Sequence, residues 1–347
     1  MPDAEFNLLV ACCRSAFTEA AQPGVSEGID WSRFLRLAER HRVEGFAWEA
    51  LRERELAPIS VAGALEEDST RTVKANLHAA AECRRLHQMF QRKGVPLLFV
   101  KGLTLGTLTY RDPLLKKSCD IDLLVPAGRI HEAGALLRQA GYRQVIPASA
   151  SLRRWHERRK ESVWRHEISH QQLDLHTRLA DNSRLVPGIG MESPRQVVEV
   201  AQSIELPTLA RDELFAYLCV HGASSAWFRL KWLTDLAALI APNSPADTER
   251  LYTRSQDLGA GRSAGQALLL AHWLFETPLS PRLHHRLGTD RAINWLARVA
   301  LGQINSEVEP TTRLFGTAMI HASQLLILPG LKFKLSELGR QVADLVT

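Results

Sequence analysis

The sequence predicts an α+β protein in which a small mixed sheet is flanked by an N-terminal helical segment and a C-terminal helical domain. Three observations predict this class. Apolar residues recur at helical spacing up to Gly94, short apolar runs then alternate with helical stretches, and helical spacing returns after Pro207. The expected parts are residues 1–72, 73–195 and 196–347.

The N-terminal part is expected to be helical. Between Trp31 and Glu55, apolar residues recur at roughly helical spacing among charged ones, which is typical of amphipathic helices. A further long helix is predicted to end at Gly94, with a basic last turn. The residues expected on its inward face are Val73, Leu77, Ala80, Ala81 and Leu86.

Short elements alternate in the middle part of the chain. The predicted strands are 95–100, 121–125, 162–168 and 172–179, and the predicted helices are 103–110 and 129–140. The last two strands lie close enough in the sequence to form a hairpin that turns near Ser169 to Gln172. This alternation predicts a sheet unit, and the pattern after Pro207 predicts helices towards the C-terminus.

Composition limits the classes of protein. The 347 residues carry a formal net charge of +5, from 43 basic and 38 acidic side chains. This balance slightly favours a phosphate-bearing partner but is too even to indicate a nucleic-acid-binding protein. The five cysteines include no C-x-x-C pair, which argues against a disulfide framework or a zinc site. No apolar run approaches the ~20 residues that span a bilayer, so we expect a cytoplasmic protein without a membrane partner.

Two acids open the predicted strand at 121–125. Asp120 and Asp122 stand two positions apart in KKSCDIDLLV, so their side chains point to the same face of a strand. Two like charges at this distance repel each other unless a cation lies beside them. Mg²⁺, bound through a few carboxylates and substrate phosphates, is such a cation. The alternative is an exposed strand end where both acids are simply hydrated.

Two neighbouring segments favour the metal interpretation. Upstream, a strand runs into Lys101-Gly102 and then into a helix, an arrangement that points backbone N–H groups at an anion. Downstream, Asp174, His176 and Arg178 share one face of a predicted strand. Plainer explanations stay open, since the turn can be a simple connection and Asp174 can pair with Arg178. Together, the turn, the acid pair and the third acid are more specific than any one of them.

These segments resemble a known family. The stretch from Val95 to Arg143, followed by LDLHTRL at 173–179, is similar to the uncharacterised nucleotidyltransferase-like family within the DNA polymerase beta-type nucleotidyltransferase superfamily. Flanking helical segments extend the resemblance to about residues 30–280. Many superfamily members carry Gly-Ser at the phosphate turn, where this chain has Lys101-Gly102.

The resemblance implies a nucleotidyltransferase sheet with a metal-dependent site. In that superfamily the D-x-D acids and a third acid on a neighbouring strand hold two metal ions on a nucleoside triphosphate. By resemblance, Asp120, Asp122 and Asp174 are the catalytic and metal-binding residues, and Asp174 acts as a ligand or as the general base towards a hydroxyl. The implied cofactor is Mg²⁺, as two ions, with Mn²⁺ as a possible substitute. The residues expected to bind substrate phosphates are Lys101, Gly102, Lys116, Lys117, His176 and Arg178.

The most basic stretch, residues 151–166, allows two interpretations. Its basic side chains alternate with Trp155 and Trp164, a pattern that can grip a nucleotide or an RNA strand. A solvated helix face is the favoured interpretation. The nearby histidines lack a recognised zinc spacing, and His176 is expected to position Asp174 or to pack beside it.

The resulting hypothesis is an enzyme, a nucleotidyltransferase that moves a nucleoside monophosphate from a nucleoside triphosphate to a hydroxyl of a small molecule, peptide or protein. Two alternatives stay open. The chain can be a non-catalytic nucleotide- or partner-binding module on the same scaffold, or a transferase that uses another phosphate-linked donor, such as a nucleotide sugar. Fold-level analogy does not supply the base or the acceptor.

Overall fold

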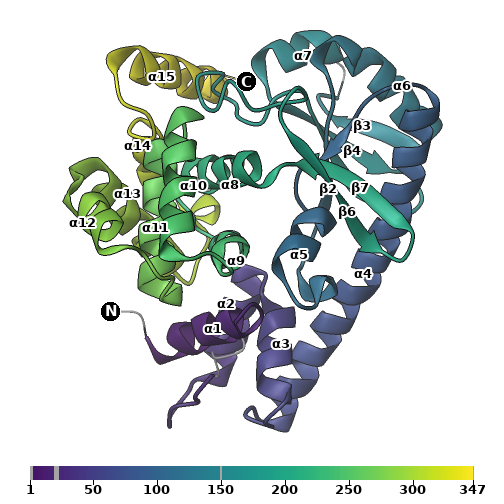
Figure 1. Ribbon diagram of the computed structural model, residues 1–347. Helices are drawn as coiled ribbons and strands as arrows, with labels where there is room; N and C mark the ends of the chain where they lie inside the picture. Colours follow the sequence, from purple (N-terminus) through teal and green to yellow (C-terminus); the bar gives the residue numbers. More distant parts are fainter. Residues whose placement is uncertain (1–2, 19–22, 149–150, 347) are drawn as a thin grey trace. The chain divides into compact units, whose positions relative to one another are not determined.

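The computed structural model describes residues 3–18, 23–148 and 151–346 and confirms the α+β class (Figure 1). The chain forms two compact units. The helical unit comprises residues 1–71, 109–111 and 215–347, and the sheet unit comprises residues 72–108 and 112–214. The long helix α4, Ile59–Arg92, has residues in both units. No helix in the described part of the chain is long and apolar enough to cross a bilayer.

The helical unit consists of short helices, several of which begin at a capping side chain. Asp3, Asp30, Ser244, Ser280 and Asp290 each accept a hydrogen bond from a backbone N–H two or three residues further on. These bonds provide partners for N–H groups that a helix start leaves without one. Besides the first part of α4, its elements are α1 (Ala4–Ser15), α2 (Trp31–His41), α3 (Glu44–Arg52), α8 (Arg211–Ser224, which starts in the sheet unit), α9 (Leu230–Ile240), α10 (Pro245–Asp257), α11 (Gly261–Phe275), α12 (Pro281–Thr289), α13 (Arg291–Ile304), the 3-10 turn Pro310–Thr312, α14 (Ala318–Gln324) and α15 (Leu331–Val346).

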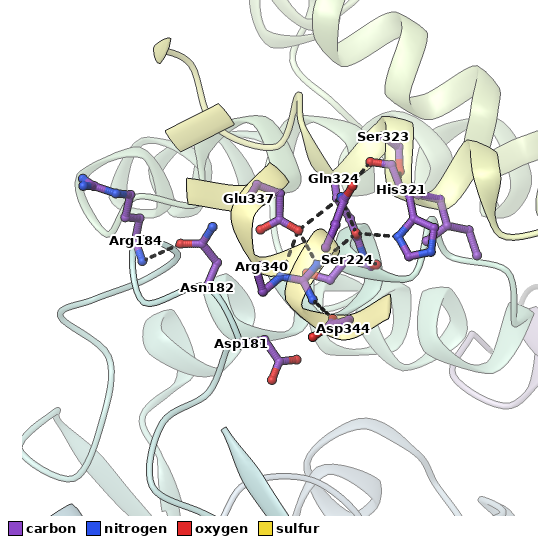
Figure 2. Close-up of polar contacts among 12 residues, drawn as sticks. Asp181, Asn182, Arg184, Ser224, His321, Ser323, Gln324, Glu337, Arg340 and Asp344 are labelled. Atoms are coloured by element: carbon purple, nitrogen blue, oxygen red, sulfur yellow. Dashed lines mark hydrogen bonds and ion pairs between the residues drawn. The ribbon is translucent and has the colours of Figure 1, made fainter. Parts of the chain in front are cut away.

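A polar cluster fixes the last helix of this unit. The guanidinium of Arg340 in α15 donates to Gln324 Oε1 at 3.1 Å and to Asp344 Oδ2 at 2.7 Å, and it also pairs with Glu337 (Figure 2). Gln324 in turn donates to the backbone carbonyl oxygen of Ser224 at 2.7 Å. The cluster therefore connects α15 and α14 to the end of α8.

The sheet unit contains a five-stranded mixed sheet and a separate two-stranded hairpin. The strand order of the sheet is β1-β2-β5-β4-β3, in which β2 and β5 are parallel and all other neighbours are antiparallel. The predicted hairpin of β4 and β5 is confirmed. The strands are β1 (Leu98–Phe99), β2 (Asp120–Leu124), β3 (Tyr142–Ile146), β4 (Glu161–His166), β5 (Gln172–His176), β6 (Arg195–Ala201) and β7 (Ile204–Leu209), and the helices are α5 (Leu103–Thr109), α6 (Ile130–Gln139), α7 (Leu152–Arg158) and the 3-10 turns Pro113–Leu115 and Ala127–Arg129.

One face of the sheet packs against α6 and α7 in a continuous apolar core. Trp164 of β4 is fully buried there. A Cβ on Gly134 of α6 would lie 2.6 Å from Leu152 Cδ1 and 3.5 Å from the Trp164 ring, so glycine permits this close approach. The sheet residues of this face are Ile121, Leu123, Trp164, Leu173 and Leu175.

Two parts of the sheet unit differ from the predicted elements. Strand β1 is shorter than the predicted run at 95–100, in which Pro96 has no N–H to offer a neighbouring strand. The sequence pattern does not predict the antiparallel hairpin of β6 and β7. Its residues Val198, Val200 and Leu206 are nonetheless buried in the same core as the second half of α4.

The predicted inward face of α4 is confirmed only in part, since Ala80 and Leu86 are buried and Val73 is partly buried. Leu77 is 51% exposed and Ala81 is exposed as well. The buried Asn76 donates from Nδ2 to the backbone oxygens of Leu114, at 2.7 Å, and Lys116, at 2.8 Å. Because these bonds hold Asn76 inward, the helical period places its neighbour Leu77 outside.

Candidate active site

The parallel pair of β2 and β5 places three acids on one face of the sheet. Asp120 and Asp122 lie on β2, and in the register of the pair Asp122 is opposite Asp174 while Asp120 is opposite Gln172. Directly paired residues point to the same face of a sheet, so the three carboxylates share the face opposite α6 and α7. Asp122 and Asp174 are buried, and Asp120 is partly exposed.

A pocket opens beside the acids of β2. Lys101, Gly102, Asp120 and Asp122 line it. Gly102 has a φ of 65°, the left-handed conformation that glycine adopts without strain. Much of the remaining lining is apolar and comes from α4, β1, α5 and β7, through Ala79, Cys83, Phe99, Leu103 and Leu206.

Asp122 has two close partners. Lys101 Nζ lies 2.9 Å from Asp122 Oδ1, and His176 Nε2 lies 3.0 Å from the same oxygen. An ionised carboxylate only accepts hydrogen bonds, so His176 Nε2 is the donor. Burial would raise the pKa of Asp122, but the Lys101 ammonium and the His176 hydrogen bond outweigh burial and hold this pKa well below its usual range. Asp122 is therefore ionised at neutral pH.

Glu161 is a fourth acid on this face, and the sequence pattern does not single it out. It begins β4 and is paired with His176 in the register of β4 and β5. Glu161 Oε2 lies 2.6 Å from Lys160 Nζ and 3.3 Å from His176 Nδ1, the latter without hydrogen-bond geometry. Burial raises the pKa of Glu161, but Lys160 and His176 lower it by more, so the net shift is downward. The predicted strand starts one residue later, at Ser162, so the sequence pattern does not place Glu161 on the face that carries the other acids.

The pKa of Asp174 shifts in the opposite direction. Burial, together with repulsion from Asp122, Glu161 and Asp120, raises it to about 7. Gln172 Nε2 donates to Asp174 Oδ1 at 3.1 Å. Burial is the largest cause of this shift and the three neighbouring carboxylates add to it, so a cation beside Asp174 would favour its ionised form.

This arrangement of acids agrees with the family resemblance of the sequence. A family model described as uncharacterised nucleotidyltransferase matches residues 27–276. The chain belongs to this family. The matched residues of this nucleotidyltransferase-family chain include Lys101, the three aspartates and Glu161, and the match ends just after α11. No curated protein sequence matches the chain.

The acids of this nucleotidyltransferase-family site fit a hard divalent cation by their chemistry. Carboxylate oxygens are the ligands that Mg²⁺ prefers. Within residues 3–18, 23–148 and 151–346, no three His, Cys, Asp or Glu side chains converge as a bound ion would require. Beside Asp122 the positive charge comes from Lys101. Asp120, Asp122 and Asp174 have the ligand type and share one sheet face, and their role as metal ligands stays a prediction.

Four of the predicted phosphate-binding residues do not line the pocket, namely Lys116, Lys117, His176 and Arg178. Lys116 is buried, and its aliphatic stem packs against Gly106 of α5, while Lys117 is partly exposed. The guanidinium of Arg178 donates to the backbone oxygen of His156 at 2.6 Å. Their role towards phosphates stays a prediction, whereas Lys101 and Gly102 do lie at the pocket.

The basic stretch at 151–166 forms α7 and β4, so the expectation of a single solvated helix face is wrong for its second half. Trp164 is a core residue, with the Arg138 guanidinium 5.3 Å from its ring centre. Trp155 Nε1 donates to the backbone oxygen of Glu161 at 2.7 Å. Because Trp164 is buried, the two tryptophans do not form one exposed surface for stacking bases.

Proposed function

We propose that the chain is a metal-dependent nucleotidyltransferase that moves a nucleoside monophosphate from a nucleoside triphosphate to a hydroxyl of a small molecule, peptide or protein. The observation that carries this proposal is the pairing of Asp122 with Asp174, with Asp120 on the same strand face and the Lys101-Gly102 pocket beside it. Membership of the nucleotidyltransferase family supports the class of reaction.

The proposed roles follow from position. Asp120, Asp122 and Asp174 would hold Mg²⁺, as two ions, or Mn²⁺. When bound, the metal would polarise the reacting phosphate and lower the pKa of the attacking hydroxyl. His176 keeps the Asp122 carboxylate in a fixed orientation through its hydrogen bond. Asp174, beside Asp122 on the next strand, would accept the hydroxyl proton at its carboxylate.

The pocket would receive the phosphates of the donor. Lys101 and Gly102 line it together with two of the acids, so a phosphate there would meet a positive charge next to the metal ligands. Lys116, Lys117, His176 and Arg178 remain proposed contributors to phosphate binding. A cytoplasmic location would supply both the triphosphate and reducing conditions for the chain's cysteines.

A nucleotide- or partner-binding module without catalysis is the second candidate. The distance of 2.9 Å between Lys101 Nζ and Asp122 Oδ1 favours it, because the most buried acid of the D-x-D pair already has a cation. A nucleotide-sugar donor would use the same acids and differ in its leaving group. The three functions can therefore be distinguished by the donor that the protein binds and by the product, if any, that it releases.

Binding is tested first, by calorimetric titration of ATP, GTP, CTP and UTP, each with and without Mg²⁺. The proteins are the wild type, the double variant Asp120→Asn/Asp122→Asn, and Asp257→Asn as a control on the exposed surface of α10. We expect Mg²⁺-dependent binding of at least one triphosphate to the wild type and to the control, and loss of binding in the double variant. Absence of triphosphate binding to the wild type contradicts the proposal.

Turnover is tested next with the triphosphate that binds and a set of hydroxyl-bearing acceptors. Release of pyrophosphate with transfer of the labelled α-phosphate supports nucleotidyl transfer. Release of nucleoside diphosphate from a nucleotide sugar supports the alternative donor. Metal-dependent binding without turnover of any donor supports the binding module.

A further inference from the structure

Lys101 stands where the proposed site needs a metal ion. Its Nζ lies 2.9 Å from Asp122 Oδ1, and the two side chains are only 18% and 3% exposed. The same oxygen also takes the hydrogen bond from His176 Nε2 at 3.0 Å. An oxygen atom that would coordinate the ion is thus already engaged by an ammonium and by an imidazole.

The charges nearby explain why an ammonium is stable in this position. Asp122 shares its sheet face with Asp174, and the neighbouring strand adds Glu161. Lys160 is paired with Glu161 at 2.6 Å, and Lys101 is paired with Asp122. In the absence of a metal ion, Lys101 therefore supplies the positive charge that Asp122 requires in a buried setting.

An ammonium and a divalent ion compete for this position. Mg²⁺ needs its oxygen ligands at about 2.0–2.1 Å and repels a positive charge next to it. The long flexible stem of a lysine side chain lets its ammonium change partners. Lys101 lines the pocket together with Gly102, so a phosphate bound in that pocket would lie near the Lys101 side chain.

We propose that Lys101 couples the binding of the metal ion to the binding of the triphosphate. In the empty site Lys101 neutralises Asp122, and when a donor enters Lys101 moves to a phosphate and leaves Asp122 for the ion. This inference rests on the proposed function. Because such coupling is reciprocal, the nucleotide strengthens metal binding by the factor by which the metal strengthens nucleotide binding. The metal alone binds weakly, and the metal with a triphosphate binds tightly.

The test measures Mn²⁺ affinity by electron paramagnetic resonance on the full chain. Wild type and Lys101→Met are titrated with Mn²⁺ alone and with the preformed Mn²⁺ complexes of ATP, GTP, CTP and UTP. Methionine keeps the shape of the lysine stem and removes the charge. We expect Lys101→Met to bind Mn²⁺ alone about tenfold more tightly than the wild type, and to bind no Mn²⁺–triphosphate complex more tightly.

Two control variants separate occupation of the site from a general change of charge. Lys160→Met removes a positive charge from the same face without touching Asp122, and it is expected to gain less Mn²⁺ affinity than Lys101→Met. Lys101→Arg keeps the charge and is expected to bind Mn²⁺ alone as weakly as the wild type. If Lys101→Met fails to fold by circular dichroism, Lys101→Gln repeats the measurement.

The outcomes distinguish this inference from the proposed function. The coupling role is overturned if Lys101→Met binds Mn²⁺ alone only as tightly as the wild type, or if Lys160→Met gains as much Mn²⁺ affinity as Lys101→Met. The proposed function still stands in that case, provided that the wild type binds a Mn²⁺–triphosphate complex. If the wild type binds neither Mn²⁺ nor any of the complexes, the proposed function fails, and the coupling role fails with it.

Discussion

Asp122 and Asp174 are direct neighbours across the parallel strands β2 and β5, yet their pKa values shift in opposite directions. Burial opposes ionisation of both carboxyl groups. Asp122 has Lys101 and His176 against its carboxylate, whereas Asp174 has the charge of Asp122 beside it. Such opposed shifts within one pair are typical of functional sites. They also have measurable effects on stability.

Replacing Asp174 with Asn is expected to stabilise the metal-free protein at and above neutral pH. The folded-state pKa of about 7 lies above the ordinary value of 3.8, so between these pH values the folded state holds a proton that the unfolded chain releases. Stability of the wild type therefore falls as pH rises through this window. Asparagine does not ionise, so Asp174→Asn should have a free energy of unfolding higher than the wild type by at least ~1 kcal/mol at pH 8 and by little at pH 4.

The measurement is urea unfolding in excess chelator from pH 4 to 8, with Asp257→Asn on α10 as the control. A stability difference between wild type and Asp174→Asn that does not grow with pH contradicts the raised pKa. Activity is expected to fall in the same variant, since functional sites commonly trade stability for activity.

Removal of divalent metal is expected to abolish turnover, because the acids would lose the ion that offsets their charge and polarises the phosphate. Excess chelator should stop pyrophosphate release, and added Mg²⁺ or Mn²⁺ should restore it. Far-ultraviolet circular dichroism should stay unchanged, since Lys101 keeps Asp122 paired without the metal. Undiminished turnover in chelator would exclude a metal-dependent site.

His176 is expected to matter through the orientation of Asp122. The side chain is fully buried and joins Asp122 to the region of Glu161. His176→Ala should lower Mn²⁺ affinity in the presence of triphosphate by about 10–100-fold, the range found for groups that orient metal ligands. His176→Gln keeps a donor and should recover part of the loss. Equal affinities in wild type and both variants would mean that His176 only fills space.

A side chain at Gly134 is expected to fit only at a cost in stability, because Leu152 must move. A Cβ there would lie 2.6 Å from Leu152 Cδ1, so Gly134→Ala should destabilise the sheet unit by about 1–3 kcal/mol through overpacking. The matched control is Gly63→Ala in α4, where a Cβ meets nothing within 4 Å. That variant should instead gain about 0.5–1 kcal/mol from helix propensity. Thermal unfolding of both variants tests this prediction. An unchanged stability of Gly134→Ala would mean that α6 can shift away from Leu152.

The sequence predicts which acids of the candidate site share a strand face, but it predicts few of the contacts between different strands. Strand alternation places Asp120 and Asp122 on one face, and a second short apolar strand identifies Asp174, because both signals are contained in a few consecutive residues. Glu161 and the Lys101–Asp122 pair depend on strand order and register, which no local pattern encodes.

The same distinction explains the differences in the fold. Helix α4 and two buried residues of its predicted inward face follow from periodicity, but the outward position of Leu77 depends on the bonds of Asn76 to a loop some forty residues away. The hairpin of β6 and β7 has alternating apolar residues in both strands, yet Pro207 and the polar residues between them resemble a linker in the sequence. Burial against α4 and β1, a long-range contact, makes it part of the core.

The strand order also governs when the site can exist during synthesis. Strands β2 and β5 are neighbours in the sheet, although α6, β3, α7 and β4 lie between them in the chain. A chain emerging from the ribosome has its D-x-D strand long before its parallel partner, and until then β2 keeps an unpaired edge. A nascent chain that stops before Gln172 holds Lys101 and Asp122 but neither Asp174 nor His176. The face that carries all three aspartates is therefore complete only after the segment between β2 and β5 has been translated and β5 has paired with β2.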